Sequence, residues 1–432
     1  MSSRDALLKR IDDIHSAIER HKTVSEHDTK AFNDLITSLN DARAKLNTPA
    51  PVAQLPVEIL SYIFKMCDES WRDHYSRAMA SCAPLLLLRV CRSWRDIVVS
   101  CPLLWTSVCF NTHSSGDSYA KFISAWLGRS RALPLDIWLS GLISVGTEIA
   151  LEQHASRVRT LEITGFFHEG TSLEHMTLFL SLRILKLSGP KKLTISDYLR
   201  ILHSTPLLTE LGLGSYSSSI DTGEGLAAVV HTSLRTLKLI LKDKFVCPSS
   251  ILSHLTLPAL ESLTLRCADS ATSGYLSKFF ARSSPPLKHL NITGVDAAMD
   301  IELGYLRLVP TLADLVMTCE GWFDPAATVC ATMTSDLVPG LRRLRVASPS
   351  FSVSPSFSLG ESPRLPVLLW NCSRRCPLLE VVRFGYHSYD VPQDIHDQLQ
   401  SFTRGGTLHV HIGAWFEEVN RVPCMCSRCG LQ

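Results

Sequence analysis

The sequence predicts an α/β solenoid that is preceded by helices, and three observations support this fold class. The pattern Leu-x-x-Leu-x-Leu, in which another apolar residue sometimes replaces a leucine, recurs nine times beyond residue 157. A proline stands two residues before the first leucine in six of these nine units. Upstream of the units, apolar residues recur at the three- and four-residue spacing of helices. The chain is therefore expected to begin with helices and to continue as a stack of strand–helix units.

Residues 1–47 form the first predicted segment, which is helical and resembles a coiled coil. Apolar residues from Leu7 to Ile18 alternate at spacings of four and three, and a second such run begins at Phe32. The same register meets polar residues in the centre of the segment. Two interpretations remain open. One is a helix with a weak centre that dimerises the protein as a coiled coil, and the other is two helices that break near residues 22–27 and pack within the chain.

The stretch from Leu55 to Trp105 is predicted to hold two short helices and a return turn. Pro56 suits the first turn of a helix, where its missing N–H costs nothing, and the apolar residues after it recur one turn apart. Residues 88–98 repeat this pattern on a second helix, with arginines on the opposite face. Pro102 stops that helix, so the Leu-Leu-Trp that follows can fold back onto it.

Three motifs in this stretch, taken in order, resemble the F-box family. They are Leu55-Pro-Val-Glu-Ile-Leu-Ser-Tyr-Ile-Phe, then Val90-Cys-Arg-Ser-Trp-Arg, then Pro102-Leu-Leu-Trp. The resemblance is closest to the form common in mushroom-forming fungi, and it assigns residues 48–110 to the F-box. The segment 68–83 between the motifs is longer than in the most compact F-boxes.

The resemblance implies both a role and a binding surface. F-box proteins are substrate receptors of Skp–cullin–F-box ubiquitin ligases, in which the F-box binds a Skp-type adaptor and a second domain captures the target. Some residues of the motifs must instead hold the two helices together, and the sequence does not separate the two groups. Carried over by motif position, the adaptor-facing residues are Leu55, Pro56, Ile59, Leu60, Ile63, Phe64, Leu88, Val90, Cys91 and Trp94.

The nine repeat units follow this stretch. Successive units start 24, 26, 26, 26, 27, 25, 29 and 38 residues apart, and all but the last interval lie within the roughly 20–29 residues of leucine-rich repeats. The prolines before the strands end the preceding helices. We therefore predict a leucine-rich-repeat horseshoe over residues 111–420, with further strands at Leu135 and Thr407. The units begin at Val158, Leu182, Leu208, Leu234, Leu260, Leu287, Leu312, Leu341 and Leu379.

Two segments near the C-terminus interrupt or follow the repeats. Residues 348–366 are rich in serine and proline and are predicted to protrude as a loop, which either binds a partner or is an insertion. The tail, residues 421–432, contains Cys424, Cys426 and Cys429. With a histidine from upstream, these thiolates would satisfy tetrahedral zinc. The chain lacks a second Cys-x-x-Cys pair, so free thiols are favoured and no metal is predicted.

One face of the predicted sheet is a candidate target-binding surface. In a stacked repeat the leucines point inward, and the residues between them on each strand face the other way. Cations outnumber acids among residues so placed, which favours a mildly basic surface suited to an acidic or phosphorylated segment. The alternative is a solvated face whose charges only maintain solubility. The candidates are Lys186, Lys238, Arg266, His289, Arg343, Arg345 and Arg383.

Composition argues against several classes of partner. The 432 residues carry a formal net charge of +2, which implies neither a nucleic-acid nor a membrane partner. The longest purely aliphatic run, Leu85 to Leu88, is far too short to span a bilayer. Fourteen cysteines behind a polar N-terminus without a secretory signal predict reduced thiols, and a location in the cytoplasm, the nucleus or both.

The sequence contains no phosphate-cradling glycine loop, no His-Glu-x-x-His and no nucleophile elbow. We therefore expect neither enzymatic activity nor a cofactor. The predicted function is substrate recognition for a Skp–cullin–F-box ubiquitin ligase, with a Skp-type adaptor, a cullin ligase reached through it, and an unknown protein target as partners. The alternative is a repeat scaffold unconnected to ubiquitin, in which the F-box-like stretch caps the solenoid and buries its apolar stripe.

Overall fold

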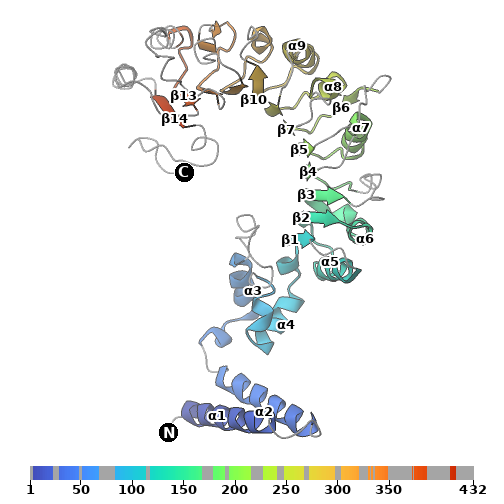
Figure 1. Cartoon of the computed structure of the whole chain (residues 1–432), viewed down its shortest axis with the longest axis vertical. Coiled ribbons are helices and arrows are strands. Elements are labelled where there is room, and N and C mark those ends of the chain that lie inside the picture. Colours follow the sequence, from blue (N-terminus) through green and yellow to red (C-terminus); the bar gives the residue numbers. More distant parts are fainter. Residues whose placement is uncertain are drawn as a thin grey trace. The chain divides into compact units, whose positions relative to one another are not determined.

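The structure is a computed structural model, and the chain divides into two compact units (Figure 1). Unit 1 comprises Met1–Phe110 and Ala120–Asp136, and unit 2 comprises Asn111–Tyr119 and Ile137–Gln432. The structure describes residues 3–22, 29–47, 51–67, 83–112, 117–167, 179–189, 194–215, 227–240, 248–266, 272–296, 303–320, 329–330, 332–333, 336–348, 372, 374–386 and 409–414.

Unit 1 begins with a pair of helices. Helix α1 spans Ser3–Lys22 and α2 spans Thr29–Asn47, and the two lie side by side (Figure 1). Their facing apolar residues are buried against each other, and Arg43 lies 2.9 Å from the ring of His15. The apolar stripes of this segment are therefore paired within one chain. The buried residues are Ile11, Ile14, Ile18, Leu39 and Ala42.

The next part of unit 1 consists of short helices, as predicted. Val57–Met66 form α3 and Arg92–Ser100 form α4. Pro56 lies just before the first helical residue, as its N-cap, and α3 therefore starts one residue later than predicted. The described residues of this part also form three 3₁₀ turns: η1 (Pro51–Gln54), η4 (Leu87–Arg89) and η5 (Pro102–Trp105).

The predicted return of the chain onto α4 is confirmed. The indole Nε1 of Trp105 donates a 2.9 Å hydrogen bond to the carbonyl oxygen of Val98, and both residues are fully buried. Helix α5 (Asp117–Arg129) contributes Trp126, whose ring meets that of Trp105 edge-on at 4.8 Å. Phe110 from strand β1 (Ser107–Thr112), which was not predicted, also packs on Trp126. This aromatic cluster is a core of unit 1.

Unit 2 is built on a large parallel sheet, and each of the nine repeat units supplies one strand of it. The strands follow one another in chain order, except that β6 (Val229–Val230) and β8 (Leu255–Thr256) pair separately. The strands of the large sheet in unit 2 are β2 (Leu135–Ile143), β3 (Val158–Phe167), β4 (Ile184–Gly189), β5 (Glu210–Ser215), β7 (Thr236–Leu239), β9 (Ser262–Arg266), β10 (His289–Asp296), β11 (Asp314–Glu320), β12 (Arg343–Ser348), β13 (Val381–Tyr386) and β14 (His409–Ala414).

The repeat units are equivalent in space as well as in sequence. The backbone N–H just before β4, β5, β7 and each strand from β9 to β13 donates to the carbonyl of the matching residue one unit earlier, as in Arg183 to Arg159 at 2.8 Å. The same bond joins Glu380 to Arg342 at 2.8 Å, although these units start 38 residues apart. The long interval is therefore accommodated without loss of strand register.

The leucines of the repeats form the core of unit 2. Leu161, Leu185, Leu211, Leu237 and their counterparts in later strands are all buried. Helices lie along the outer side of the strands in Figure 1 and cover this face. Each strand–helix unit packs against the units before and after it, so unit 2 is an α/β solenoid-like fold. The helical elements whose bounds the structure describes include α6 (Val145–Glu152), η6 (Ala155–Arg157), α7 (Ile195–Ser204), α8 (Pro248–Ser253), α9 (Thr272–Ser283) and η8 (Gly304–Leu308).

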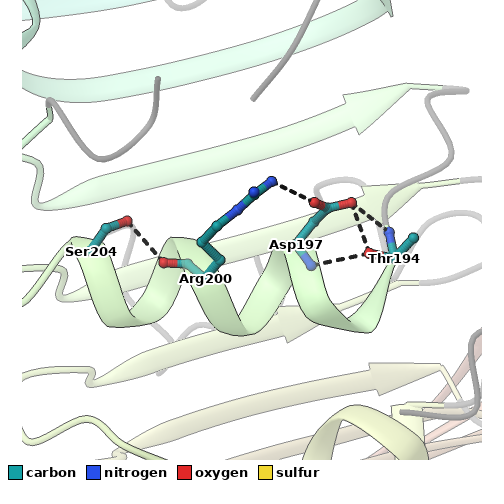
Figure 2. Close-up of polar contacts among 4 residues, drawn as sticks. All are labelled: Thr194, Asp197, Arg200 and Ser204. Carbon is teal, nitrogen blue, oxygen red and sulfur yellow. Dashed lines mark hydrogen bonds and ion pairs between the residues drawn. The ribbon is translucent and has the colours of Figure 1, made fainter. Parts of the chain in front are cut away.

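Helix α7 shows how the sequence starts one of these helices (Figure 2). The hydroxyl of Thr194 accepts a 3.1 Å hydrogen bond from the backbone N–H of Asp197, and the Asp197 carboxylate accepts one of 3.0 Å from the backbone N–H of Thr194. Arg200 donates to the other carboxylate oxygen at 2.7 Å. This reciprocal capping box satisfies amides that would otherwise lack partners at the helix start.

We predict that Thr194→Ala lowers the free energy of unfolding of unit 2 by about 1 kcal/mol, because the Asp197 amide loses its acceptor. Urea denaturation of the full chain measures the effect. Thr194→Ser keeps the hydroxyl and should stay within about 0.5 kcal/mol of wild type. Equal losses in the two variants would contradict the assignment of the cap.

Candidate functional site

The first candidate site is an apolar surface on α3. We define the α3 surface as Val57, Ile59, Tyr62, Ile63 and Met66. Their exposed fractions are 48%, 48%, 66%, 41% and 50%. Ile59, Tyr62, Ile63 and Met66 share one side of the helix because they are spaced by three or four residues, and Val57 is the first residue of the helix. Leu55 and Pro56, also predicted to face the adaptor, are exposed just before the helix.

The opposite side of α3 faces the interior of unit 1. Leu60 is 4% exposed and Phe64 is 1% exposed. The ring of Phe64 packs against Trp94 of α4 at 4.7 Å between ring centroids. Leu60 and Phe64, which were predicted to face the adaptor, therefore hold the two helices together. Because they are buried, they contribute to a binding surface only by fixing the position of α3. Burial thus distinguishes the residues of the motif that pack inside the domain from those that are exposed.

The second half of the predicted surface is partly open. Val90 is 53% exposed, whereas Leu88, Cys91 and Trp94 are half-buried. The side chain of Arg95 donates a 3.1 Å hydrogen bond to the carbonyl of Leu88, which holds the 3₁₀ turn beside α4. Val90 is therefore the most accessible of these four side chains.

The predicted set did not include several exposed apolar residues in this part of unit 1. Val57, Tyr62 and Met66 belong to the α3 surface, and Leu86, 46% exposed, lies just before η4. A signal was present in the sequence, because Ile59, Tyr62, Ile63 and Met66 stand at spacings of three and four. The prediction followed the residues of the motif instead of this full stripe.

The second candidate site lies in unit 2. We define the open face as the face of its large sheet formed by residues that alternate with the buried leucines. Lys186 on this face lies 3.7 Å from Glu162 on β3 and 3.5 Å from Glu210 on β5. Lys238 on β7 lies 3.6 Å from the same oxygen of Glu210. Both predicted lysines thus have carboxylate partners on neighbouring strands.

Asp314 on β11 organises the next part of the open face. It lies 2.5 Å from the ring of His289 on β10, and it accepts two hydrogen bonds from Arg343 on β12, one of them 2.6 Å long. The hydrogen bond to Asp314 raises the pKa of the Arg343 guanidinium. Two of the predicted target-binding residues are therefore already engaged by one carboxylate.

A hollow of about 180 Å³ opens on this part of the sheet, lined by residues of β9, β10, β11 and β12. Its lining includes Asp314 with its partners His289 and Arg343. Thr264, Asn291 and Arg345 also line it. The side-chain oxygen of Asn291 is buried, and it has no hydrogen-bond partner among the described residues. Such an acceptor is costly to leave unmatched.

The remaining predicted cations also lie on the open face. Arg266 is at the end of β9, and Arg345 and Arg383 occupy the same register position on β12 and β13. All three are half-buried. The Nε of Arg383 is buried and lacks a hydrogen-bond partner among the residues that the structure describes.

Three buried thiols of unit 2 interact with one another. Cys330, Cys372 and Cys376 are buried. The hydrogen bond with Cys330 raises the pKa of Cys372 to about 12, and the hydrogen bond with Cys372 raises the pKa of Cys376. Thiols held protonated in this way are poor nucleophiles and poor metal ligands.

Several predictions fall outside the described residues. They are the zinc alternative at Cys424, Cys426 and Cys429, the loop 348–366 beyond Ser348, and most of the segment 68–83. Within the described ranges, no group of three or more histidine, cysteine or acidic side chains is placed to hold a metal ion. None of the described helices is both long and apolar enough to cross a membrane.

Comparisons with known proteins bear on unit 1. Residues 52–111 match the family model of the F-box-like domain, so this part of the chain is an F-box-like domain. No curated protein matches the chain. A solved structure, the crystal structure of the Rad7 and Elc1 complex in yeast, aligns with a TM-score of 0.39 and 13% identity, covering 90% of this chain and 98% of that chain.

Proposed function

We propose that this protein is a substrate-recognition subunit of a Skp–cullin–F-box ubiquitin ligase. The F-box-like domain binds a Skp-type adaptor, which links the chain to a cullin, and unit 2 captures a protein target. The observation that supports the first step is the α3 surface, five apolar side chains between 41% and 66% exposed within the matched residues. In this role the chain contributes proximity between target and ligase instead of a chemical step.

The α3 surface has the character of the centre of a protein interface. Stable interfaces bury about 1,000 Å² or more, and a few apolar or aromatic residues near the centre supply most of the binding free energy. Ile59, Tyr62 and Ile63 occupy adjacent turns of one helix, with Val90 and Leu86 exposed elsewhere in the domain. Large apolar side chains gathered in this way on one surface favour a partner over permanent contact with water.

Unit 2 supplies the second half of the proposal. We assign its strand–helix units to the leucine-rich repeats, on the basis of the Leu-x-x-Leu-x-Leu pattern and the strand-to-strand backbone ladder. Extended sheets of this kind present long binding surfaces. Target capture is therefore assigned to the open face.

The test is binding of the full chain to a purified Skp-type adaptor, measured by isothermal titration calorimetry. We expect Ile59→Asp with Ile63→Asp to weaken binding about 10- to 100-fold, because each carboxylate would be desolvated at the interface. Ile149→Asp with Leu207→Asp is the matched control, since these residues of unit 2 are 50% and 49% exposed. The control should bind as wild type does.

The possible outcomes separate the ligase proposal from the scaffold alternative. Wild-type binding that only the α3 variant loses supports a ligase subunit. A well-folded wild type that does not bind any Skp-type adaptor would favour a repeat scaffold unconnected to ubiquitin. Melting temperatures of both variants should match wild type, because all four residues lie at the surface.

A further inference from the structure

The hollow on the open face is lined by two rows of side chains, each of which crosses β9, β10, β11 and β12 at one register position. Its volume of about 180 Å³ is below the roughly 300–1,000 Å³ of pockets that hold whole small molecules. The hollow is therefore of a size to receive one side chain of a partner protein. The first row is Ser262, His289, Asp314 and Arg343, and the second row is Thr264, Asn291, Val316 and Arg345.

The charged groups that line the hollow already have partners. Asp314 is the only acidic residue of the lining, and it accepts two hydrogen bonds from Arg343 and lies 2.5 Å from the ring of His289. Arg345 also has an interaction of its own within the chain. A cationic side chain of a partner would therefore find no unmatched carboxylate in the lining, and an anionic one would find no arginine without an existing contact.

The neutral polar groups of the hollow are the ones that lack partners. The side-chain oxygen of Asn291 is buried and accepts no hydrogen bond from the described residues. Within the same part of the chain, the hydroxyl groups of Ser262 and Thr264 also have no hydrogen-bond partner. Asparagine is an uncommon residue inside strands, and a buried acceptor without a donor destabilises the protein that carries it. Asn291 is thus placed for a donor that a partner supplies.

A carboxamide matches this arrangement better than any other side chain. Its N–H can donate to the Asn291 oxygen, and its own oxygen can accept from the Thr264 hydroxyl on the next strand, about 4.8 Å away. A carboxylate has no proton to donate and would set oxygen against oxygen. An apolar side chain of similar size would leave Asn291 unmatched. Sites built to hydrogen-bond a ligand strongly reject analogues that lack the bonding group.

We propose that the hollow is a specificity pocket for a glutamine side chain of a target protein. The glutamine amide lies between Asn291 on β10 and Thr264 on β9. The methylene stem packs against Val316 on β11, which is the register partner of Asn291 on the other side. The inference rests on the proposed function in taking the owner of this glutamine to be a ligase target.

The test is saturation-transfer difference NMR of the full-length protein with the peptide Gly-Ser-Gln-Ser-Gly, because this method detects weak ligands of large proteins. We expect magnetisation to reach the methylene protons of the glutamine. The same peptide with glutamate or leucine in the central position should give a signal weaker by about threefold or more, since neither side chain can donate to Asn291.

Two kinds of variant locate the peptide in the hollow. Asn291→Leu should lower the glutamine signal about tenfold and melt no lower than wild type, because an apolar group replaces an unmatched buried acceptor. A purely structural role for Asn291 would instead lower the melting temperature. Thr264→Val should lower the signal about threefold. Thr236→Val is the matched control and should leave the signal unchanged, because Thr236 on β7 is the register partner of Ser262 but does not line the hollow.

Three results would overturn the proposal: no transfer to the glutamine peptide, an equal or stronger signal from the glutamate or leucine peptide, or a wild-type signal in Asn291→Leu. A stronger signal from glutamate would identify a site for anions instead. If Asn291→Leu melts below wild type, the threonine pair decides. Equal signals in Thr264→Val and Thr236→Val would then overturn the proposal.

Adaptor binding is tested separately from the peptide site. The glutamine peptide should give the wild-type signal with the Ile59→Asp and Ile63→Asp double variant, whose substitutions lie in unit 1. Failure of adaptor binding would therefore leave the peptide result intact, and failure of peptide binding would leave the adaptor result intact.

Discussion

Trp105→Ala is expected to lower the free energy of unfolding of unit 1 by about 3–5 kcal/mol, the range found when a buried aromatic residue is truncated to alanine. The Trp105 side chain is fully buried, and its indole N–H bonds to Val98 at 2.9 Å. Its ring meets Trp126 edge-on at 4.8 Å, and the guanidinium of Arg129 lies 4.6 Å above it. The variant loses all these contacts and leaves a cavity between α4 and α5.

The effect is measured by urea denaturation, with hydrogen exchange of the α4 amides reporting on unit 1 itself. Tyr62→Ala is the matched aromatic control, because Tyr62 is 66% exposed and its removal should cost less than about 0.5 kcal/mol. We also expect Trp105→Ala to lose adaptor binding at temperatures where α4 exchanges freely. A loss of stability below about 1 kcal/mol would show that the return turn does not hold the domain together.

The contrast between these two aromatic residues indicates what the sequence could establish in unit 1. The Pro-Leu-Leu-Trp motif predicted a return onto the second helix, and Trp105 makes that contact. On α3, Ile59, Leu60, Ile63 and Phe64 were all parts of one motif. Adjacent apolar residues on a helix differ by about 100° in direction, so the wide stripe covers both the interior and the surface. Only the position of α4 decides which side is buried.

In unit 2 the repeat pattern predicted both the strands and which of their residues are buried. Each Leu-x-x-Leu-x-Leu unit supplied a strand, and the burial of its leucines followed from the alternation along the strand. The pattern also placed the charged residues on one face, but it did not show which of them would lie close enough to pair. In the folded sheet the side chain of Glu210 lies 3.5 Å from Lys186 and 3.6 Å from Lys238 on the neighbouring strands, and Asp314 is the register partner of Arg343.

Gly165→Ala is expected to destabilise unit 2 by about 3 kcal/mol or more, because it forces two backbones apart. A Cβ at Gly165 on β3 would lie 2.7 Å from the backbone nitrogen of Gly141 on β2 and closer still to its carbonyl oxygen. Gly141 has a φ of 93°, a conformation that suits glycine. A flexible side chain could move away, but these backbone atoms can yield only if β2 and β3 separate.

Gly212→Ala provides a control on the same sheet. A Cβ at Gly212 would meet Lys186 Cγ at 3.3 Å, and the lysine side chain can shift, so we expect a change of less than about 1 kcal/mol. Thermal unfolding gives the stability of both variants, and hydrogen exchange of the β2 and β3 amides locates the change. Gly165→Ala should open these two strands first and leave β9 to β12 protected, since each repeat contacts mainly its neighbours. A wild-type melting temperature for Gly165→Ala, or an equal loss in Gly212→Ala, would show that the close approach of Gly141 and Gly165 does not constrain the start of the sheet in unit 2.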